Sequence, residues 1–257
     1  MTTLQQSMLL LAKLLALALV AAAESSAPPK VKQLLYFDAR GAAELTRVLL
    51  KVGKIPFEDT RFSIIQNAGK FETPDFTKAK ESGALKANMD RVPLMILDNG
   101  VNLGQSKAME RYVARECGMM GATALETAVI DCVAEHVRDI KDKWGKVRNI
   151  GGMAPNAEKD EATAKFLSAD GEYFQFLGKL ERSLPQDRTE GFSVGSSSTY
   201  ADYCIWNLVK DTFLDDNTQS PSLAVAAKFS AIMKICTTVE SNTDLKEYLA
   251  NRKVTKF

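Results

Sequence analysis

Tyr36 is the first residue of this sequence whose type and position could serve chemistry. It stands near the end of the short apolar run 33–37, directly before the charged turn 38–41. A phenolic hydroxyl at such a position can donate a hydrogen bond to a bound ligand. The alternative is a core or capping tyrosine whose hydroxyl is already satisfied within the protein.

The chain offers few histidine and cysteine side chains for catalysis or metal binding. Its single histidine, His136, disfavours multi-histidine metal sites and histidine-based triads. The four cysteines form no C-x-x-C pair, which excludes a thioredoxin-type dithiol and disfavours a structural zinc site. They lie in apolar helical patterns that are typical of buried small residues, at Cys117, Cys132, Cys204 and Cys236. Because none precedes Cys117, chemistry in the N-terminal half must use something other than a protein thiolate.

Composition is that of an ordinary globular protein. The chain has 257 residues, a length that is enough for two modest domains that each bury a core. Of its residues, 46% are hydrophobic and 25% are charged. The net charge is +1, so no global field attracts nucleic acid or acidic lipid.

The first 23 residues predict a signal or targeting leader. They form an apolar run, interrupted by Lys13, with an A-x-A-like cleavage pattern near residues 21–23. A polar, proline-containing linker follows at 24–31. The apolar run after Lys13 is too short for a comfortable membrane span. Such a leader indicates secretory or organelle targeting, with no membrane contact after its removal; a tail on a cytoplasmic protein is the alternative.

Residues 32–117 must build the framework that positions Tyr36. The pattern predicts a strand at 32–37, a helix that carries Leu45, Val48, Leu49 and Val52 and ends at Gly53, and a strand at 55–63. Residues 66–90 are polar and broken, with a short helix around 76–80. A buried strand at 93–97, the turn 98–100 and a partner strand at 101–104 precede a helix at 105–117. The order is βαβ followed by ββα.

Residues 118–257 predict helices only. Thr123 and Glu126 form a capping box at the start of a helix that reaches Trp144, and Thr199 and Asp202 begin another. The predicted helices after the first lie at 160–180, 199–213, 221–236 and 243–252.

Three segments give the sequence a resemblance to the cytosolic glutathione transferases. The Y-F-x-x-R-G core at 36–41, the segment "RVPLMILDNGVNLGQSKAMERYVARE" and the helix start "STYADYCIW" occur in the order of that family, and the match covers roughly 32–252. The tyrosine and its "YF" context resemble the sigma group. The resemblance implies a thioredoxin-like domain at 32–117, an all-helical domain at 118–257, and glutathione as co-substrate with no metal.

By this resemblance, Tyr36 activates the glutathione thiol, which is only about 3% thiolate at pH 7. Pro93 is expected to be cis, with the backbone of Val92 binding the cysteinyl part and Arg91 touching the ligand; a plain strand-start proline is the alternative. Gln105 and Ser106, at a helix N-terminus, are assigned to the γ-glutamyl end, although Ser106 can also serve as an N-cap.

Other positions depart from the family pattern. Phe76 and Lys80 keep the spacing of the tryptophan and lysine that hold the glycine carboxylate, but phenylalanine supplies no indole donor. Ala42 replaces an arginine that commonly supports the tyrosine, which leaves Arg40 as the only nearby cation. Both departures slightly favour the alternative of a non-catalytic glutathione-binding protein.

The helical domain adds a contact between subunits. Glu135, with Asp131 on the same helix face, matches an acid that reaches the partner's γ-glutamyl amine in related dimers; a solvated carboxylate pair is the alternative. His136 is expected at an interface or on the surface. Phe37, Trp144 and Trp206 are candidates for the electrophile cleft or for the core, with the core favoured for Trp206.

The main hypothesis is therefore a homodimeric glutathione S-transferase that joins glutathione to hydrophobic electrophiles in detoxification, without nucleic-acid partners. The alternatives are a glutathione-dependent isomerase similar to prostaglandin D synthase and a non-catalytic structural protein.

Overall fold

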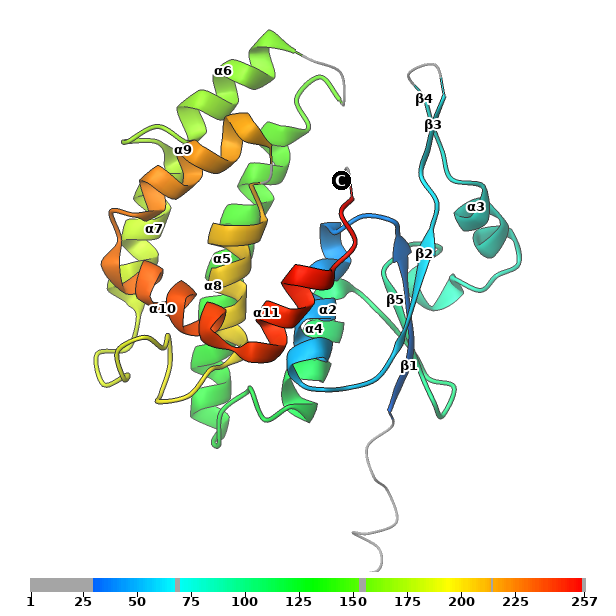
Figure 1. The fold of residues 1–257 in the computed structure, drawn as a ribbon, viewed down its shortest axis with the longest axis horizontal. Coiled ribbons are helices and arrows are strands. Elements are labelled where there is room, and N and C mark those ends of the chain that lie inside the picture. The colour runs from blue at the N-terminus through cyan, green and yellow to red at the C-terminus, as the bar shows by residue number, and fades with distance from the viewer. Residues whose placement is uncertain (1–29, 68–69, 153–155, 214, 256–257) are drawn as a thin grey trace, which may run out of the picture.

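The computed structural model describes residues 30–67, 70–152, 156–213 and 215–255 (Figure 1). The predicted leader at 1–23 lies outside these residues. The described chain has a sheet at one side, helices at the other, and three helices between them.

A four-stranded sheet organises the N-terminal half, with the order β2-β1-β5-β6. Its strands are β1 (Val31–Phe37), β2 (Glu58–Phe62), β5 (Leu94–Leu97) and β6 (Asn102–Gly104). β1 is parallel to β2 and antiparallel to β5, which is antiparallel to β6. This arrangement confirms the predicted βαβ-ββα order.

Helices cover both faces of this sheet because β1 buries alternate side chains on opposite sides. Leu34 joins the large core beneath α2 (Glu44–Val52) and α4 (Ser106–Glu116), whereas Leu35 joins a smaller core with Phe62, Leu85 and Leu94. Phe76 of α3 (Pro74–Glu81) packs on that smaller core. Figure 1 shows α3 on the outer side of the sheet and α2 and α4 on the side of the helical half.

The helical half is built around α8, whose residues are almost all buried. The helices are α5 (Ala124–Arg148), α6 (Ala157–Phe166), α7 (Glu172–Ser183), α8 (Tyr200–Asp211), α9 (Asp216–Ala226), α10 (Ser230–Ser241) and α11 (Thr243–Asn251). Both predicted capping boxes are present, at the starts of α5 and α8. α11 returns to contact α2, so the C-terminal helix joins the two halves (Figure 1).

Two predicted helices are broken in the structure. The helix expected at 160–180 is two helices, α6 and α7, separated by a turn. In this turn the Ser168 hydroxyl bonds the Asp170 carboxylate. The backbone at Gly171 passes so close to the end of α6 that a Cβ there would lie 2.4 Å from the Lys165 carbonyl oxygen. The helix expected at 221–236 is α9 and α10. Glu181 of α7 accepts a hydrogen bond from the Ala231 N–H at 2.7 Å, so a distant side chain caps α10.

A small hairpin at the start of the polar segment 66–90 was not predicted. Its strands β3 (Ile65–Asn67) and β4 (Lys70–Glu72) are exposed and only three residues long, too short to leave a pattern in the sequence.

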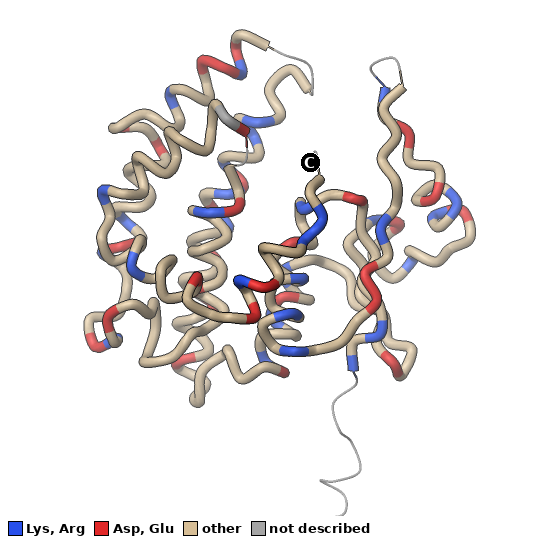
Figure 2. Tube along the Cα trace, in the orientation of Figure 1, with Lys and Arg blue, Asp and Glu red and all other residues tan. Residues whose placement is uncertain are grey.

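Charged residues of both signs are interspersed over the two halves, in keeping with the small net charge (Figure 2). In the part of the chain that the structure describes, no single helix is long and apolar enough to cross a membrane; α9 and α10 pass that test only as a pair, bent by 115°.

Candidate active site

Three neighbouring strands bring the predicted ligand-binding residues to one end of the sheet. Leu35 of β1 lies opposite Leu94 of β5, and Leu94 lies opposite Gly104 of β6. The neighbouring residues toward this end are therefore Tyr36, which follows Leu35, Pro93, which precedes Leu94, and Gln105, which follows Gly104. Residues that are up to 69 positions apart in the sequence (36 to 105) thus meet along one edge.

The Tyr36 hydroxyl accepts a hydrogen bond from the Ala42 backbone N–H at 3.1 Å. This contact depends on Gly41, which has φ +44° and leaves no room for a side chain, because a Cβ there would lie 2.5 Å from the hydroxyl oxygen. The hydroxyl oxygen thus already accepts a hydrogen bond from within the protein. The tyrosine proton is left to be donated to a ligand.

Arg47, not Arg40, is the cation next to the tyrosine. Its guanidinium carbon lies 5.8 Å from the centre of the Tyr36 ring, and its side chain is fully buried. It donates to the Ala39 carbonyl at 2.8 Å and pairs with Asp59 at 3.1 Å and with Glu44 at 3.3 Å. The expectation of Arg40 as the only nearby cation is wrong. Arg47 lies off the stripe of Leu45, Val48, Leu49 and Val52, so the periodicity of α2 gave no signal for it.

Arg40 instead faces the helical half, where its guanidinium is 3.6 Å from the Asp211 carboxylate of α8. Its role in glutathione binding stays a prediction.

The Val92–Pro93 bond is cis, as expected. Pro93 is buried, Val92 is half-buried, and Arg91 is exposed, with its guanidinium 3.3 Å from the Met89 sulfur. The backbone of Val92 therefore lies near the edge of the sheet where β1 ends, just after Tyr36.

Gln105 and Ser106 form the start of α4. Gln105 is its N-cap, with φ +66°, a left-handed conformation that is uncommon for a residue other than glycine. Ser106 is the first helical residue rather than the N-cap, and no side chain caps the helix. The first N–H groups of α4 can therefore receive an anion such as a carboxylate.

Phe76 has a packing role. Its ring is 5.0 Å from that of Phe37 and 6.1 Å from that of Phe62, in the smaller core. Lys80, one turn later on α3, is exposed. Contact of either residue with glutathione stays a prediction.

Glu135 and Asp131 of α5 both bind Arg111 of α4. The Arg111 Nε lies 2.7 Å from Asp131, and its other nitrogen bonds Glu135, which also pairs with Arg138 at 2.7 Å. Burial alone would raise the pKa of the Glu135 carboxyl, but Arg111 outweighs it and the pKa is lowered. The two acids are therefore not simply solvated. Sequence reasoning missed Arg111, and a contact with a partner subunit stays a prediction.

The cysteines differ in exposure. Cys204 and Cys236 are buried, and burial raises the pKa of each thiol to about 12, so both stay protonated at neutral pH. Cys117 is half-buried. Cys132 is exposed, with its sulfur 3.5 Å from His136 Nε2, which corrects the expectation that all four are buried. The described residues contain no cluster of three or more potential metal ligands.

Both tryptophans belong to the core, since Trp144 and Trp206 are 5% and 2% exposed. Phe37 is half-buried against Tyr36 and Phe76. The proposed electrophile cleft thus receives neither tryptophan.

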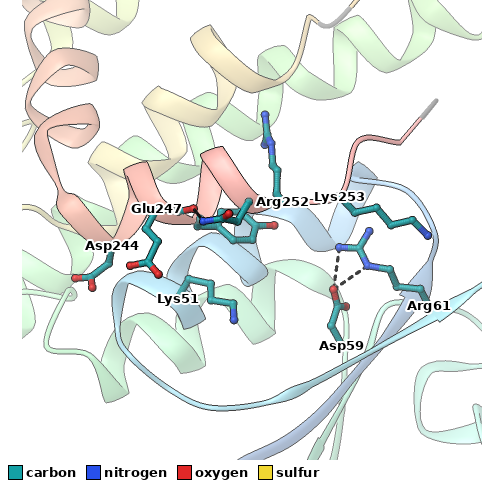
Figure 3. A pocket seen from close by; sticks show the side chains of 9 residues that line it. Lys51, Asp59, Arg61, Asp244, Glu247, Arg252 and Lys253 are labelled. Carbon is teal, nitrogen blue, oxygen red and sulfur yellow. Dashed lines mark hydrogen bonds and ion pairs between the residues drawn. The ribbon is translucent and has the colours of Figure 1, made fainter.

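A polar pocket of about 430 Å³ lies beside this site, between β2, α2 and α11 (Figure 3). Lys51 of α2 and Glu247 of α11 border it, and Asp59 pairs with Arg61 at its edge. None of the predicted glutathione-binding residues lines it.

Comparison with known proteins identifies the fold and family. The family model for the glutathione S-transferase C-terminal domain matches residues 141–252. A glutathione S-transferase of Plasmodium falciparum is 30% identical over 227 residues, which cover 86% of this chain and 95% of that protein. The chain belongs to the glutathione S-transferase family.

Further relatives agree with the assignment. Hematopoietic prostaglandin D synthase of Gallus gallus is 27% identical over 220 residues, which cover 86% of this chain and 96% of that protein. The crystal structure of Na-GST-3, described as a monomeric glutathione S-transferase of Necator americanus, has a TM-score of 0.70 and 26% identity and covers 88% of this chain and 98% of its own. The transferase fold was thus correctly predicted.

Proposed function

We propose that this transferase-family chain is an enzyme that conjugates the thiolate of glutathione to hydrophobic electrophiles. The observation that carries the proposal is the Tyr36 hydroxyl, which is held by the Ala42 N–H at 3.1 Å with its proton free to donate. A hydrogen bond to the glutathione sulfur favours the thiolate, and each unit by which it lowers the thiol pKa corresponds to about 1.4 kcal/mol. The buried Arg47 guanidinium lies 5.8 Å from the centre of the same ring, where it is held by Glu44 and Asp59.

Glutathione would lie across the edge where β1, β5 and β6 end. The Val92 backbone would bind the cysteinyl part, and the N-terminus of α4 at Gln105 and Ser106 would bind the γ-glutamyl carboxylate. Tyr36 and the Val92–Pro93 segment lie at the same edge of the sheet, which supports a position for the sulfur next to Tyr36. Arg91, Phe76, Lys80 and Arg40 remain candidates for the rest of the tripeptide.

Replacement of Tyr36 by phenylalanine tests the proposal. Tyr36→Phe keeps the ring but removes the donor, so we expect kcat/KM for 1-chloro-2,4-dinitrobenzene to fall by about 10- to 100-fold, which is one to two pKa units of lost thiol activation. Glutathione binding, measured by calorimetry, should change little. The apparent thiol pKa, read from the rate as a function of pH, should rise.

The control is Tyr112→Phe, which removes a hydroxyl from α4, six residues after the helix start at Ser106. Equal rates for the parent and Tyr36→Phe would remove the tyrosine from the mechanism. A parent that binds glutathione and conjugates nothing would support a non-catalytic binding protein.

The relative named prostaglandin D synthase favours a second candidate, a glutathione-dependent isomerase of the same fold. Such an enzyme needs the thiolate as well but returns glutathione unchanged. Mass balance distinguishes the two, since conjugation consumes free thiol in proportion to product whereas isomerisation consumes none.

Further proposals concern assembly and processing. We propose a homodimer, with Glu135 and Asp131 near the partner, tested by sedimentation of the parent and of Glu135→Gln. We also propose a cleaved leader at 1–23, a linker at 24–31, and a boundary between domains at 117/118. An N-terminus near Glu24 in mass spectrometry would support cleavage, and an intact Met1 would contradict it.

A further inference from the structure

Asn88 is a buried polar residue between the two segments that are proposed to bind glutathione. It is the last residue of the short 3-10 helix η2 (Lys86–Asn88) and is only 5% exposed. Met89 and Asp90, which follow it, have φ +54° and +58°. Two consecutive non-glycine residues in the left-handed region turn the chain back sharply, and the surrounding contacts must hold that turn in place.

The Asn88 amide bonds both segments at once. Its Nδ2 donates to the Pro93 carbonyl at 2.8 Å and to the Arg91 carbonyl at 3.3 Å, one residue on either side of Val92. Its Oδ1 accepts a hydrogen bond from the Gln105 backbone N–H at 3.2 Å. One planar group therefore fixes the segment around Val92 relative to the N-cap of α4.

Gly104 shows how closely this amide packs. A Cβ on Gly104 would lie 2.4 Å from the Asn88 Oδ1 and 2.8 Å from the Asn88 Cβ. Real Cβ atoms do not approach so closely, so the strand β6 can pass only because residue 104 has no side chain. The position of the amide and the path of β6 into Gln105 therefore depend on each other.

We propose that Asn88 is a positioning residue that sets the affinity for glutathione by holding the Val92 backbone and the α4 N-terminus at a fixed separation. This inference rests on the proposed function. The cysteinyl and γ-glutamyl parts belong to one small ligand, so both contacts form together only when the two segments are correctly spaced. Asn88 touches neither part and acts through Arg91, Pro93 and Gln105.

Two substitutions reach this contact from opposite sides. Asn88→Ala removes the amide, and Gly104→Ala displaces it while keeping it. Each should raise the calorimetric Kd for glutathione about tenfold, which is about 1.4 kcal/mol. Because both act on one contact, the double variant should bind about tenfold, not 100-fold, more weakly than the parent.

Asn156→Ala is the matched control. Asn156 is an asparagine whose Oδ1 also accepts backbone hydrogen bonds, from Glu158 at 2.9 Å and Lys159 at 3.4 Å, but at the start of α6 in the helical half. Its removal should leave the Kd within twofold of the parent. Amide exchange at Gln105 should accelerate in Asn88→Ala and not in the control.

Asn88→Asp covers the case in which Asn88→Ala does not fold. At neutral pH its carboxylate still accepts from Gln105 but repels the Arg91 and Pro93 carbonyls. Protonation at lower pH restores a donor, so the Kd relative to the parent should fall as the pH falls.

The outcomes separate the two proposals. If the parent binds glutathione and Asn88→Ala binds equally well, or if the two single effects multiply to 100-fold, the positioning role is overturned and the proposed function stands. A pH-independent Kd ratio for Asn88→Asp would also overturn it. If the parent binds no glutathione, the proposed function fails and this inference with it.

Discussion

Arg47 shows what a single buried charge contributes to the tyrosine end of β1. Its guanidinium joins Glu44 of α2, Asp59 of β2 and the Ala39 carbonyl in the loop that follows β1. We expect Arg47→Met to lower the free energy of unfolding by about 3–5 kcal/mol, because it leaves Glu44 buried with a weakened set of partners. Urea denaturation measures the loss.

Arg61→Met provides the comparison. Arg61 also binds Asp59, at 2.8 Å, but its side chain is 17% exposed, and its other partner, Asp38, is 27% exposed. Water can replace these bonds in part, so the loss should be about 1 kcal/mol. Equal losses in the two variants would show that burial does not distinguish them.

Two capping boxes of similar sequence show how burial changes the contribution of a helix cap to the free energy of unfolding. Asp202 of α8 is fully buried and accepts from the Ser193 and Thr199 N–H groups, both at 2.6 Å. Asp202→Ala leaves these donors unpaired in the core, so we expect a loss of about 2–4 kcal/mol in thermal or urea unfolding.

The exposed box at the start of α5 is the control. Glu126 accepts from the Ala122 N–H at 2.8 Å and the Thr123 N–H at 3.2 Å, where water can replace it. Glu126→Ala should cost about 0.5–1 kcal/mol. A larger loss for Glu126→Ala than for Asp202→Ala would contradict the argument.

At the scale of the whole molecule, the C-terminal end holds the two halves together. Arg252 pairs with Glu44 of α2 at 3.1 Å and with Asp211 of α8 at 2.8 Å, and Tyr248 donates to Glu44 at 2.9 Å. Arg252→Met should release the end of α11, since the two buried carboxylates each lose one of their partners and the helix end loses both of its ion pairs. Hydrogen exchange of the α11 amides should then become faster.

Lys253→Met tests the specificity of that effect. Lys253 pairs with Asp38 at 2.5 Å, but its side chain is 59% exposed. Its loss should leave α11 protection unchanged. Faster exchange in both variants would assign the effect to the C-terminal segment as a whole rather than to Arg252.

The elements with a clear local pattern of apolar residues or a local capping motif were predicted from the sequence. The βαβ-ββα order, both capping boxes and the cis Pro93 expected from the family resemblance are present. The predictions that failed concern places where a distant group decides, such as the Glu181 side chain that caps α10. Local patterns contain no information about such partners.

The sequence alone determined the fold class, the family and the place of Tyr36 at the end of β1, because alternation, caps and motif order are local properties of the chain. Only the tertiary structure decided that Arg47 rather than Arg40 lies beside the tyrosine ring, that Arg111 pairs with Glu135 and Asp131, and that Asn88 joins Pro93 to Gln105. The partners in these contacts are far apart in the sequence and meet only when the chain folds. Their ion pairs and hydrogen bonds gain strength only when folding removes the groups from water.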